Sequence, residues 1–207
     1  VEVAATGLHW TFSPCITVPK DDRWGRQYEG FSESTSLVTR LTHAAITGYE
    51  DKLAKVNGRK IAACAKHFIG DGGTSWETGT LQEGMHTYKI DRGNTDITEE
   101  ELRKVHLPPY LEAINAGVKT IMISFNSWNG IKCHGSKYLI DDLLKNELKF
   151  DGLVVTDAME MGALNNIKSS EACVRAVEAG ADIILLPLDV DSTINAIKEA
   201  VLSGRIT

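Results

Sequence analysis

The chain has 207 residues, of which 43% are hydrophobic and 24% charged, and its formal net charge is −6. This composition is typical of a globular protein with enough apolar side chains for a sizeable core. The negative charge disfavours nucleic acid and anionic membranes as partners. No run of about 18 apolar residues occurs, so the sequence predicts no membrane span.

Strand-like and helix-like segments alternate along the first half of the chain. Apolar residues recur every three or four positions in the first helical segment, and the strand before Lys66 and His67 is almost entirely apolar. The predicted elements are, in order, a strand at 8–12 ending near Ser13-Pro14, a helix at 34–49, a strand at 61–65, and a long Gly- and Thr-rich loop at 69–96.

The second half opens with a helix-start signal. Thr98-Glu-Glu-Glu101 is a capping-box pattern, and the helix it opens continues toward Ala116. Pro108 and Pro109 must break or kink that helix, because proline lacks the backbone N–H. The remaining predicted elements are, in order, a strand at 118–124, a helix at 136–148, a strand at 153–156, a helix at 170–179, a strand at 182–186 and a helix at 192–202.

These segments form about five β/α units in what we expect to be one domain, 1–207. Segments 113–124 and 176–187 repeat the same sequence pattern, in which a helix end is followed by an Ala-Gly pair and then by a buried strand. Near-continuous apolar strands predict a parallel sheet covered on both faces, or a barrel. Long loops after the strands favour an α/β fold of the (β/α)8 TIM-barrel type. Five units cannot close eight strands, so we expect a partial barrel.

Polar side chains gather where the predicted strands end. Asp157 closes a β-branched strand, although a carboxylate there costs strand propensity. Arg26, Lys66 and His67 follow other strands, as does the segment 124–126. Cationic side chains donate to sugar hydroxyls, and a carboxylate can attack an anomeric carbon. Two other interpretations remain open, a capping role for Asp157 and a Schiff-base role for Lys66.

Four motifs, in matching order and spacing, resemble glycoside hydrolase family 3, in its β-glucosidase and glucan exohydrolase branch. They cover almost the whole chain. The motifs are Asp22-Arg-Trp-Gly-Arg-Gln-Tyr-Glu29, Ala65-Lys-His-Phe-Ile-Gly-Asp-Gly-Gly-Thr74, Met122-Ile-Ser-Phe-Asn-Ser-Trp-Asn-Gly130 and Gly152-Leu-Val-Val-Thr-Asp157.

The resemblance implies a retaining β-glycosidase that releases the non-reducing-end sugar through a covalent glycosyl-enzyme. By resemblance, Asp157 is the catalytic nucleophile. Three other residues, Arg26, Lys66 and His67, would hold the non-reducing-end sugar. The segment with Met122, Phe125 and Trp128 would help to line that subsite. A β-linked oligosaccharide or glucoside is therefore the expected substrate, and no cofactor is expected.

Three departures from the family pattern bear on activity. The early barrel strands, with a further substrate-binding Asp, and the usual proton donor are expected outside this chain. Ala158 stands where the β-glucosidase branch usually has Trp, and the following residues resemble the N-acetylglucosaminidase branch. Its Asp-His donor pair is missing from the loop at 70–77. Glu77 and Glu83 are candidate substitute donors, or solvated loop carboxylates.

Other functions and roles stay open on the sequence. The chain could be a non-catalytic fragment that self-associates and at most binds sugar, because an open sheet exposes apolar edges. A β-N-acetylglucosaminidase or β-xylosidase is a further alternative, and a homo-oligomer or companion domain would complete the barrel. The compartment is not specified; family habit suggests secretion or the periplasm.

The remaining histidines, tryptophans and cysteines divide between functional and packing interpretations. His86 and His134 fall in loops, where either could touch substrate, and Trp24 and Trp128 could stack on sugar or support a loop. No His, Asp and Glu cluster has metal-ligand spacing, so no metal is predicted. The cysteines are expected to be unpaired thiols in or near the core: Cys15, Cys64, Cys133 and Cys173.

Overall fold

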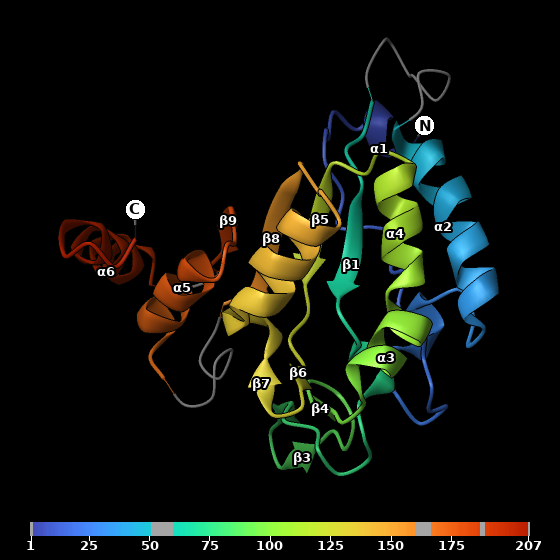
Figure 1. Cartoon of the computed structure of the whole chain (residues 1–207), viewed down its shortest axis with the longest axis horizontal. Coiled ribbons are helices and arrows are strands. Elements are labelled where there is room, and N and C mark those ends of the chain that lie inside the picture. The colour runs from blue at the N-terminus through green and yellow to red at the C-terminus, as the bar shows by residue number, and fades with distance from the viewer. Residues whose placement is uncertain (1, 51–59, 160–166, 187–188, 207) are drawn as a thin grey trace.

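The computed structural model describes residues 2–50, 60–159, 167–186 and 189–206. Its centre is a four-stranded sheet in the order β1-β5-β8-β9, and each neighbouring pair is parallel (Figure 1). These strands overlap the four predicted at 61–65, 118–124, 153–156 and 182–186, and the residues of β9 are only half-buried. The four strands are β1 (Cys64–Phe68), β5 (Thr120–Ile123), β8 (Leu153–Ala158) and β9 (Ile183–Leu185).

The predicted first strand at 8–12 is wrong, because this segment does not form a continuous strand. It nevertheless lies beside β1, at the edge of the sheet where a preceding strand would pair. It makes isolated parallel bridges with the chain at β1, from Trp10 to Ala62 and from Cys15 to Lys66. A continuous ladder cannot run between these bridges, because Pro14 has no N–H to donate. Irregularly spaced backbone hydrogen bonds still join the segment to the chain at β1, such as that from the Ala62 N–H to the His9 carbonyl at 2.8 Å, and Trp10 Nε1 donates to Thr120 Oγ1 at 2.9 Å.

Helices lie near both edge strands of the sheet, β1 and β9 (Figure 1). The first helical segment is α2 (Thr35–Glu50), and it packs beside α4 (Pro108–Asn115) near β1. The last two helices, α5 (Ser169–Glu178) and α6 (Val190–Leu202), pack together near β9 (Figure 1). A short helix, α1 (Glu2–Ala5), opens the described chain. The helices at 34–49, 170–179 and 192–202 are therefore confirmed to within two residues.

The capping signal at Thr98 is confirmed. Its side chain accepts a hydrogen bond from the backbone N–H of Glu101, and α3 (Glu99–Glu101) follows. The helix then widens into η4 (Leu102–His106), a π-helical turn, before α4 begins at Pro108. Proline fits the first turn of a helix, where an N–H has no intrahelical acceptor. The two prolines thus break the predicted helix in two, as expected.

The segment predicted as a helix at 136–148 is helical with π-type pairing, η6 (Tyr138–Glu147). Small elements gather at the carboxyl ends of the main strands, including a two-stranded and a three-stranded sheet (Figure 1). They are η1 (Gln27–Glu29), η3 (Asp71–Gly73), β2 (Gln82–Glu83), β3 (His86–Thr87), β4 (Asn94–Thr95), β6 (Ser127–Trp128), β7 (Ile131–Lys132) and η5 (Cys133–Gly135).

The core runs continuously across the sheet, from Ile16 beside β1 to Ala181 before β9. All four cysteines are buried and unpaired, as the sequence predicts. No helix in the described ranges is long and apolar enough to cross a membrane.

Candidate active site

Asp157 lies near the end of β8, which pairs with β5 on one side and β9 on the other. The ladder with β5 ends at Val155, and the ladder with β9 has pairs at Val155 and at Ala158, so strand pairing holds the backbone just before and just after this carboxylate. The side chain is half-buried, and its Oδ1 atom accepts a hydrogen bond from the N–H of Ala158 at 2.7 Å. The position combines a rigid backbone with partial access to solvent, which a nucleophile requires.

His134 lies behind Asp157. Its Nε2 atom accepts a hydrogen bond from the backbone N–H of Asp157 at 3.0 Å, and its ring meets Phe125 edge-on with centroids 5.3 Å apart. Burial lowers the pKa of His134 to about 4, so the ring is neutral. His134 is thus a fully buried support for Asp157 and not the substrate-touching loop residue considered from the sequence.

A narrow pocket opens beside Asp157 at the ends of the main strands. Four of the residues predicted to form the site line it together: Asp157, Arg26, His67 and Phe125. Its remaining lining residues are Trp24, Asp71, Asp91, Arg92, Ser124 and Asn126. Sugar-binding pockets combine hydroxyl-binding polar groups with an apolar wall, and this lining contains both.

Arg26 is held in place by a carboxylate of its own segment. Its Nε and Nη2 atoms donate to the two carboxylate oxygens of Glu29, at 2.7 and 2.9 Å. Burial opposes the charge of Arg26, but the paired carboxylate more than offsets it and raises the pKa of the guanidinium. Such a bidentate pair fixes the plane of the guanidinium, which also reaches His67.

His67 lies at the centre of a buried chain of hydrogen bonds. Its Nδ1 atom is 2.8 Å from Oδ2 of Asp71, whose Oδ1 accepts from the Thr17 hydroxyl at 2.7 Å. Burial alone lowers the pKa of His67, and the hydrogen bond to Asp71 raises it above its ordinary value.

Arg26 opposes protonation of His67 from the other side of the ring. Nη2 of Arg26 is 3.1 Å from Nε2 of His67, and a guanidinium can only donate. Nε2 must therefore accept, which leaves the ring proton on Nδ1, facing Asp71. The hydrogen bond to Asp71 favours the charged ring, but a charged ring would set its Nε2 proton against the Arg26 donor 3.1 Å away, and we therefore assign the neutral tautomer on this contact.

The other predicted sugar-binding residues lie outside the Asp157 pocket. Met122 is buried in β5, and Lys66 is half-buried in β1. Trp128 supports a loop, since its Nε1 donates to the Ile97 carbonyl at 2.9 Å and its ring stacks on Tyr138. The structure thus brings together part of the predicted set, and Trp128 takes the supporting role that the sequence left open.

The sequence missed a contribution from the long loop. Asp91 lines the pocket and accepts a hydrogen bond from Trp24 Nε1 at 3.0 Å, while the Arg92 guanidinium lies 4.2 Å from the centre of the Phe125 ring. The buried ammonium of Lys132 donates to the carbonyls of Arg92 and Phe125, at 3.2 and 3.0 Å. The sequence signal that could have indicated this contribution is the pair of adjacent charged residues, Asp91 and Arg92, directly before a glycine.

Neither of the two glutamates considered as proton donors lines the Asp157 pocket. Glu77 is exposed, with an oxygen 3.9 Å from the Lys89 ammonium. Glu83 lines a neighbouring hollow, where it accepts a hydrogen bond from the Tyr88 hydroxyl. Within the ranges that the structure describes, no group of three or more His, Cys, Asp and Glu residues could hold a metal ion.

A parallel sheet with polar side chains gathered at its strand ends is typical of enzyme domains built as barrels or as open α/β sheets. The model of the glycosyl hydrolase family 3 N terminal domain matches residues 1–207, and the chain belongs to that family. Members of this family are glycoside hydrolases, and their N-terminal domains are TIM barrels, so the predicted class and fold type are both confirmed.

The relatives and solved structures that resemble this chain also carry the names of glycoside hydrolases. A beta-xylosidase of Formosa agariphila is 32% identical over 193 residues, covering 89% of this chain and 25% of the relative. The exo-1,3/1,4-beta-glucanase of a Pseudoalteromonas species superposes with a TM-score of 0.86 at 41% identity, over 100% of this chain and 24% of that one. A mutant beta-glucosidase of Listeria innocua, in complex with laminaribiose, gives 0.84 at 30% identity, over 100% and 27%. The chain thus spans about a quarter of the length of these proteins.

Proposed function

We propose that this chain carries the nucleophile and part of the sugar-binding pocket of a retaining β-glycosidase. The observation that carries the proposal is the placement of Asp157 in one pocket with Arg26 and His67. In the first step an Asp157 oxygen bonds to the anomeric carbon as the glycosidic C–O bond breaks, and an acid protonates the leaving oxygen. In the second step, the deprotonated acid takes a proton from water as the water oxygen bonds to the anomeric carbon and displaces Asp157, which releases the sugar and restores the acid.

The neighbouring side chains suit a sugar bound against Asp157. Arg26 is fixed by Glu29 and keeps donor atoms for hydroxyl groups. His67 can exchange its contact with Arg26 for one with a hydroxyl, because its tautomer is set by Asp71 on the other side. The Phe125 ring supplies an apolar wall.

We infer that the proton donor lies in a part of the protein outside this chain. Retaining glycosidases place their two carboxyl groups about 5–5.5 Å apart, and neither Glu77 nor Glu83 lines the Asp157 pocket. Two aspartates do line it, but Asp71 is held by His67 and Thr17, and Asp91 by Trp24. The relatives are about four times as long as this chain, which supports a companion domain. Their names support β-linked glucosides as the substrate class, with xylosides as the second candidate.

Covalent labelling tests the nucleophile directly. The complete protein that contains this chain would be incubated with an activated 2-deoxy-2-fluoro-β-glucoside, and intact mass and peptide mapping would locate the added sugar. We expect label on the peptide with Asp157, and none in Asp157→Asn. The matched control is Asp151→Asn, which alters an exposed aspartate two residues before the start of β8 and should label normally. Label on any other peptide would refute the assignment.

A further inference from the structure

The segment that carries Phe125 pairs with the base of the long loop. In the parallel ladder between β4 and β6, Asn94 lies opposite Ser127, and the Ser127 N–H donates to the Gly93 carbonyl at 2.8 Å. Two residues earlier in the same register, Arg92 would lie opposite Phe125. Both of these residues line the narrow pocket, so the ladder ends where this wall of the pocket begins.

Arg92 does not continue the ladder, because its backbone is left-handed. Its φ is 57°, a conformation that residues with a Cβ atom rarely adopt. The turn is closed by the Gly93 N–H, which donates to the Ile90 carbonyl at 3.0 Å. In this conformation the Arg92 guanidinium lies 4.2 Å from the centre of the Phe125 ring. A disfavoured backbone persists only where neighbouring groups hold it, and such positions are often found at functional sites.

The Lys132 ammonium takes the place of the missing ladder contact. Its Nζ atom donates to the Arg92 carbonyl at 3.2 Å and to the Phe125 carbonyl at 3.0 Å, so one cation joins the two residues. An ammonium suits this position, because it has three N–H donors and no acceptor. The Thr80 hydroxyl also donates to the Arg92 carbonyl, at 2.9 Å.

The charge of Lys132 is kept in the interior at a cost. The residue is 6% exposed, and burial lowers the pKa of its ammonium. The carbonyls that accept its hydrogen bonds are neutral, so they offset the loss of hydration less than a carboxylate would. Replacing a buried charge by an apolar side chain of similar volume often leaves stability unchanged or raises it. Stability alone therefore does not account for a lysine here.

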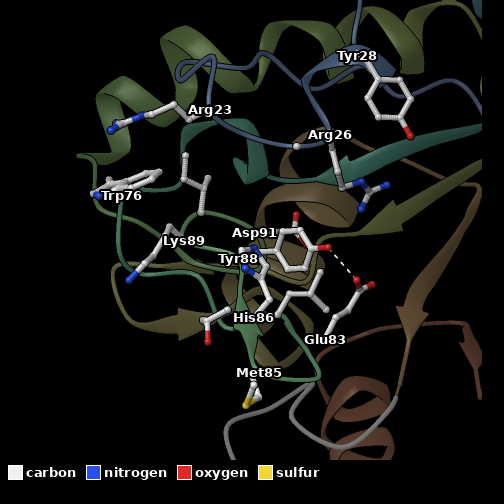
Figure 2. Close-up of a pocket in the computed structure, with 14 residues that line it drawn as sticks. Arg23, Arg26, Tyr28, Trp76, Glu83, Met85, His86, Tyr88, Lys89 and Asp91 are labelled. Carbon is white, nitrogen blue, oxygen red and sulfur yellow. Dashed lines mark hydrogen bonds between the residues drawn. The ribbon is translucent and has the colours of Figure 1, made fainter.

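We propose that Lys132 is a positioning residue for the sugar-binding pocket, because its ammonium holds the Arg92 guanidinium and the Phe125 ring together as one wall. The inference rests on the proposed function. The residue before Arg92, Asp91, lines both this pocket and the neighbouring hollow, as Arg26 does (Figure 2). Among the residues that the structure describes, Lys132 lines neither hollow, so it acts on a bound sugar through the residues that it holds.

Sugar affinity measured without turnover tests the inference. Titration calorimetry would measure glucose binding to the complete protein that contains this chain, unaltered and with Lys132→Met, which fills most of the same space but cannot donate. We expect the affinity to fall by about tenfold, the effect of one lost hydrogen bond between the sugar and a charged group. The urea midpoint of unfolding should stay the same or rise. The matched control is Lys137→Met, which alters an exposed lysine five residues further on and should change neither quantity.

Kinetics and two further variants separate positioning from packing. For an aryl β-glucoside, Lys132→Met should raise KM by a similar factor and leave kcat nearly constant, because the wall contacts the sugar before and during the reaction. Thr80→Val removes the other donor to the Arg92 carbonyl from an exposed position and should weaken glucose binding by about two- to threefold. In Arg92→Gly, the added change Lys132→Met should weaken binding by less than it does alone, because the guanidinium that it places is gone.

The outcomes separate this inference from the proposed function. Glucose affinity unchanged by Lys132→Met, with or without a loss of stability, would overturn the inference even if Asp157 takes the label. An equal effect of Lys132→Met in the presence and absence of the Arg92 side chain would also overturn it. Should Lys132→Met not fold, unchanged affinity in Thr80→Val would do so. Weaker binding in Lys132→Met of a protein whose Asp157 takes no label would reject the proposed nucleophile and retain the positioning role.

Discussion

The backbone N–H of Asp157 donates a hydrogen bond to the neutral Nε2 atom of His134, 3.0 Å away in the core. The other ring nitrogen, Nδ1, has no hydrogen-bond partner in the part of the chain that the structure describes. A fully buried polar ring thus satisfies one nitrogen only, and that bond goes to the residue proposed as nucleophile. His134 is a positioning residue, because it acts on the carboxylate through the backbone.

Replacing His134 should therefore separate positioning from packing. His134→Leu fills the space but leaves the Asp157 N–H without an acceptor, which costs about 1–3 kcal/mol of unfolding free energy. We expect kcat on an aryl β-glucoside to fall by roughly tenfold or more, because small displacements of a nucleophile are costly. KM should stay nearly constant. His134→Gln, which can still accept, should recover much of kcat; equal kcat values in the two folded variants would contradict the positioning role.

Acid should destabilise the fold through two of its buried histidines, His106 and His134. Burial lowers the pKa of both His106 and His134 to about 4. Both pKa values lie below the unfolded value of about 6.5, so in that interval the unfolded chain binds more protons than the folded one. The stabilisation is complete above about pH 6.5 and is lost as the pH falls toward about 4, by about 3 kcal/mol for each histidine.

Urea denaturation between about pH 7 and about pH 4 would measure this loss. The single variant His134→Gln should show a smaller loss of unfolding free energy than the unaltered chain over the same interval. The matched variant His9→Gln changes a histidine that is not buried in the core and should keep the original slope. Identical slopes for all three proteins would mean that His134 does not carry this dependence.

The Glu29 carboxylate should control substrate affinity through Arg26. Glu29→Gln removes the charge that holds the guanidinium by two hydrogen bonds, so the side chain gains freedom that substrate must then restrict. We expect KM to rise several-fold with little change in kcat. Glu33→Gln, an exposed change four residues further on, serves as control and should leave both constants unaltered. A fall in kcat at constant KM would assign Glu29 a different role.

Asp71 should set the tautomer of His67. In Asp71→Asn, an amide N–H can donate to Nδ1 of His67 and so favour the proton on Nε2, where it would oppose the Arg26 donor. We expect kcat/KM to fall by roughly tenfold, because the bound sugar would lose its hydrogen bond to His67. Asp96→Asn, an exposed change in the same loop, should be silent. Histidine ¹⁵N shifts would report the tautomer independently of activity.

Local sequence patterns predicted the parts of the site that lie on regular elements. Asp157 follows an apolar run, and that run alone places the carboxylate at a strand end. The sequence patterns were wrong at the predicted first strand, where Pro14 interrupts the ladder. They also misplaced the end of β1, which extends to Phe68 because its pairing with β5 continues to Ile123. Pairing between distant segments decides such boundaries, and hydropathy does not record it.

Local sequence patterns could not have predicted that Asp91 and Arg92 of the long loop line the Asp157 pocket. Trp24 meets Asp91 across 67 positions of sequence, so no periodic pattern links them. The same limit explains Trp128, where the motif places a ring in the right segment but the Ile97 carbonyl decides its direction. A glycine- and threonine-rich composition predicts a loop without predicting which of its residues return to the strand ends.

Two hydrogen bonds from the Lys132 ammonium divide the long loop into a base that is held in place and a tip whose sequence can change more freely. At its base, the Lys132 ammonium ties the Arg92 carbonyl to that of Phe125, and the Thr95 hydroxyl donates to the Gly70 carbonyl at 2.7 Å. The β2-β3 tip beyond this base is exposed. Changes in tip sequence can therefore accumulate without disturbing the residues around Asp157.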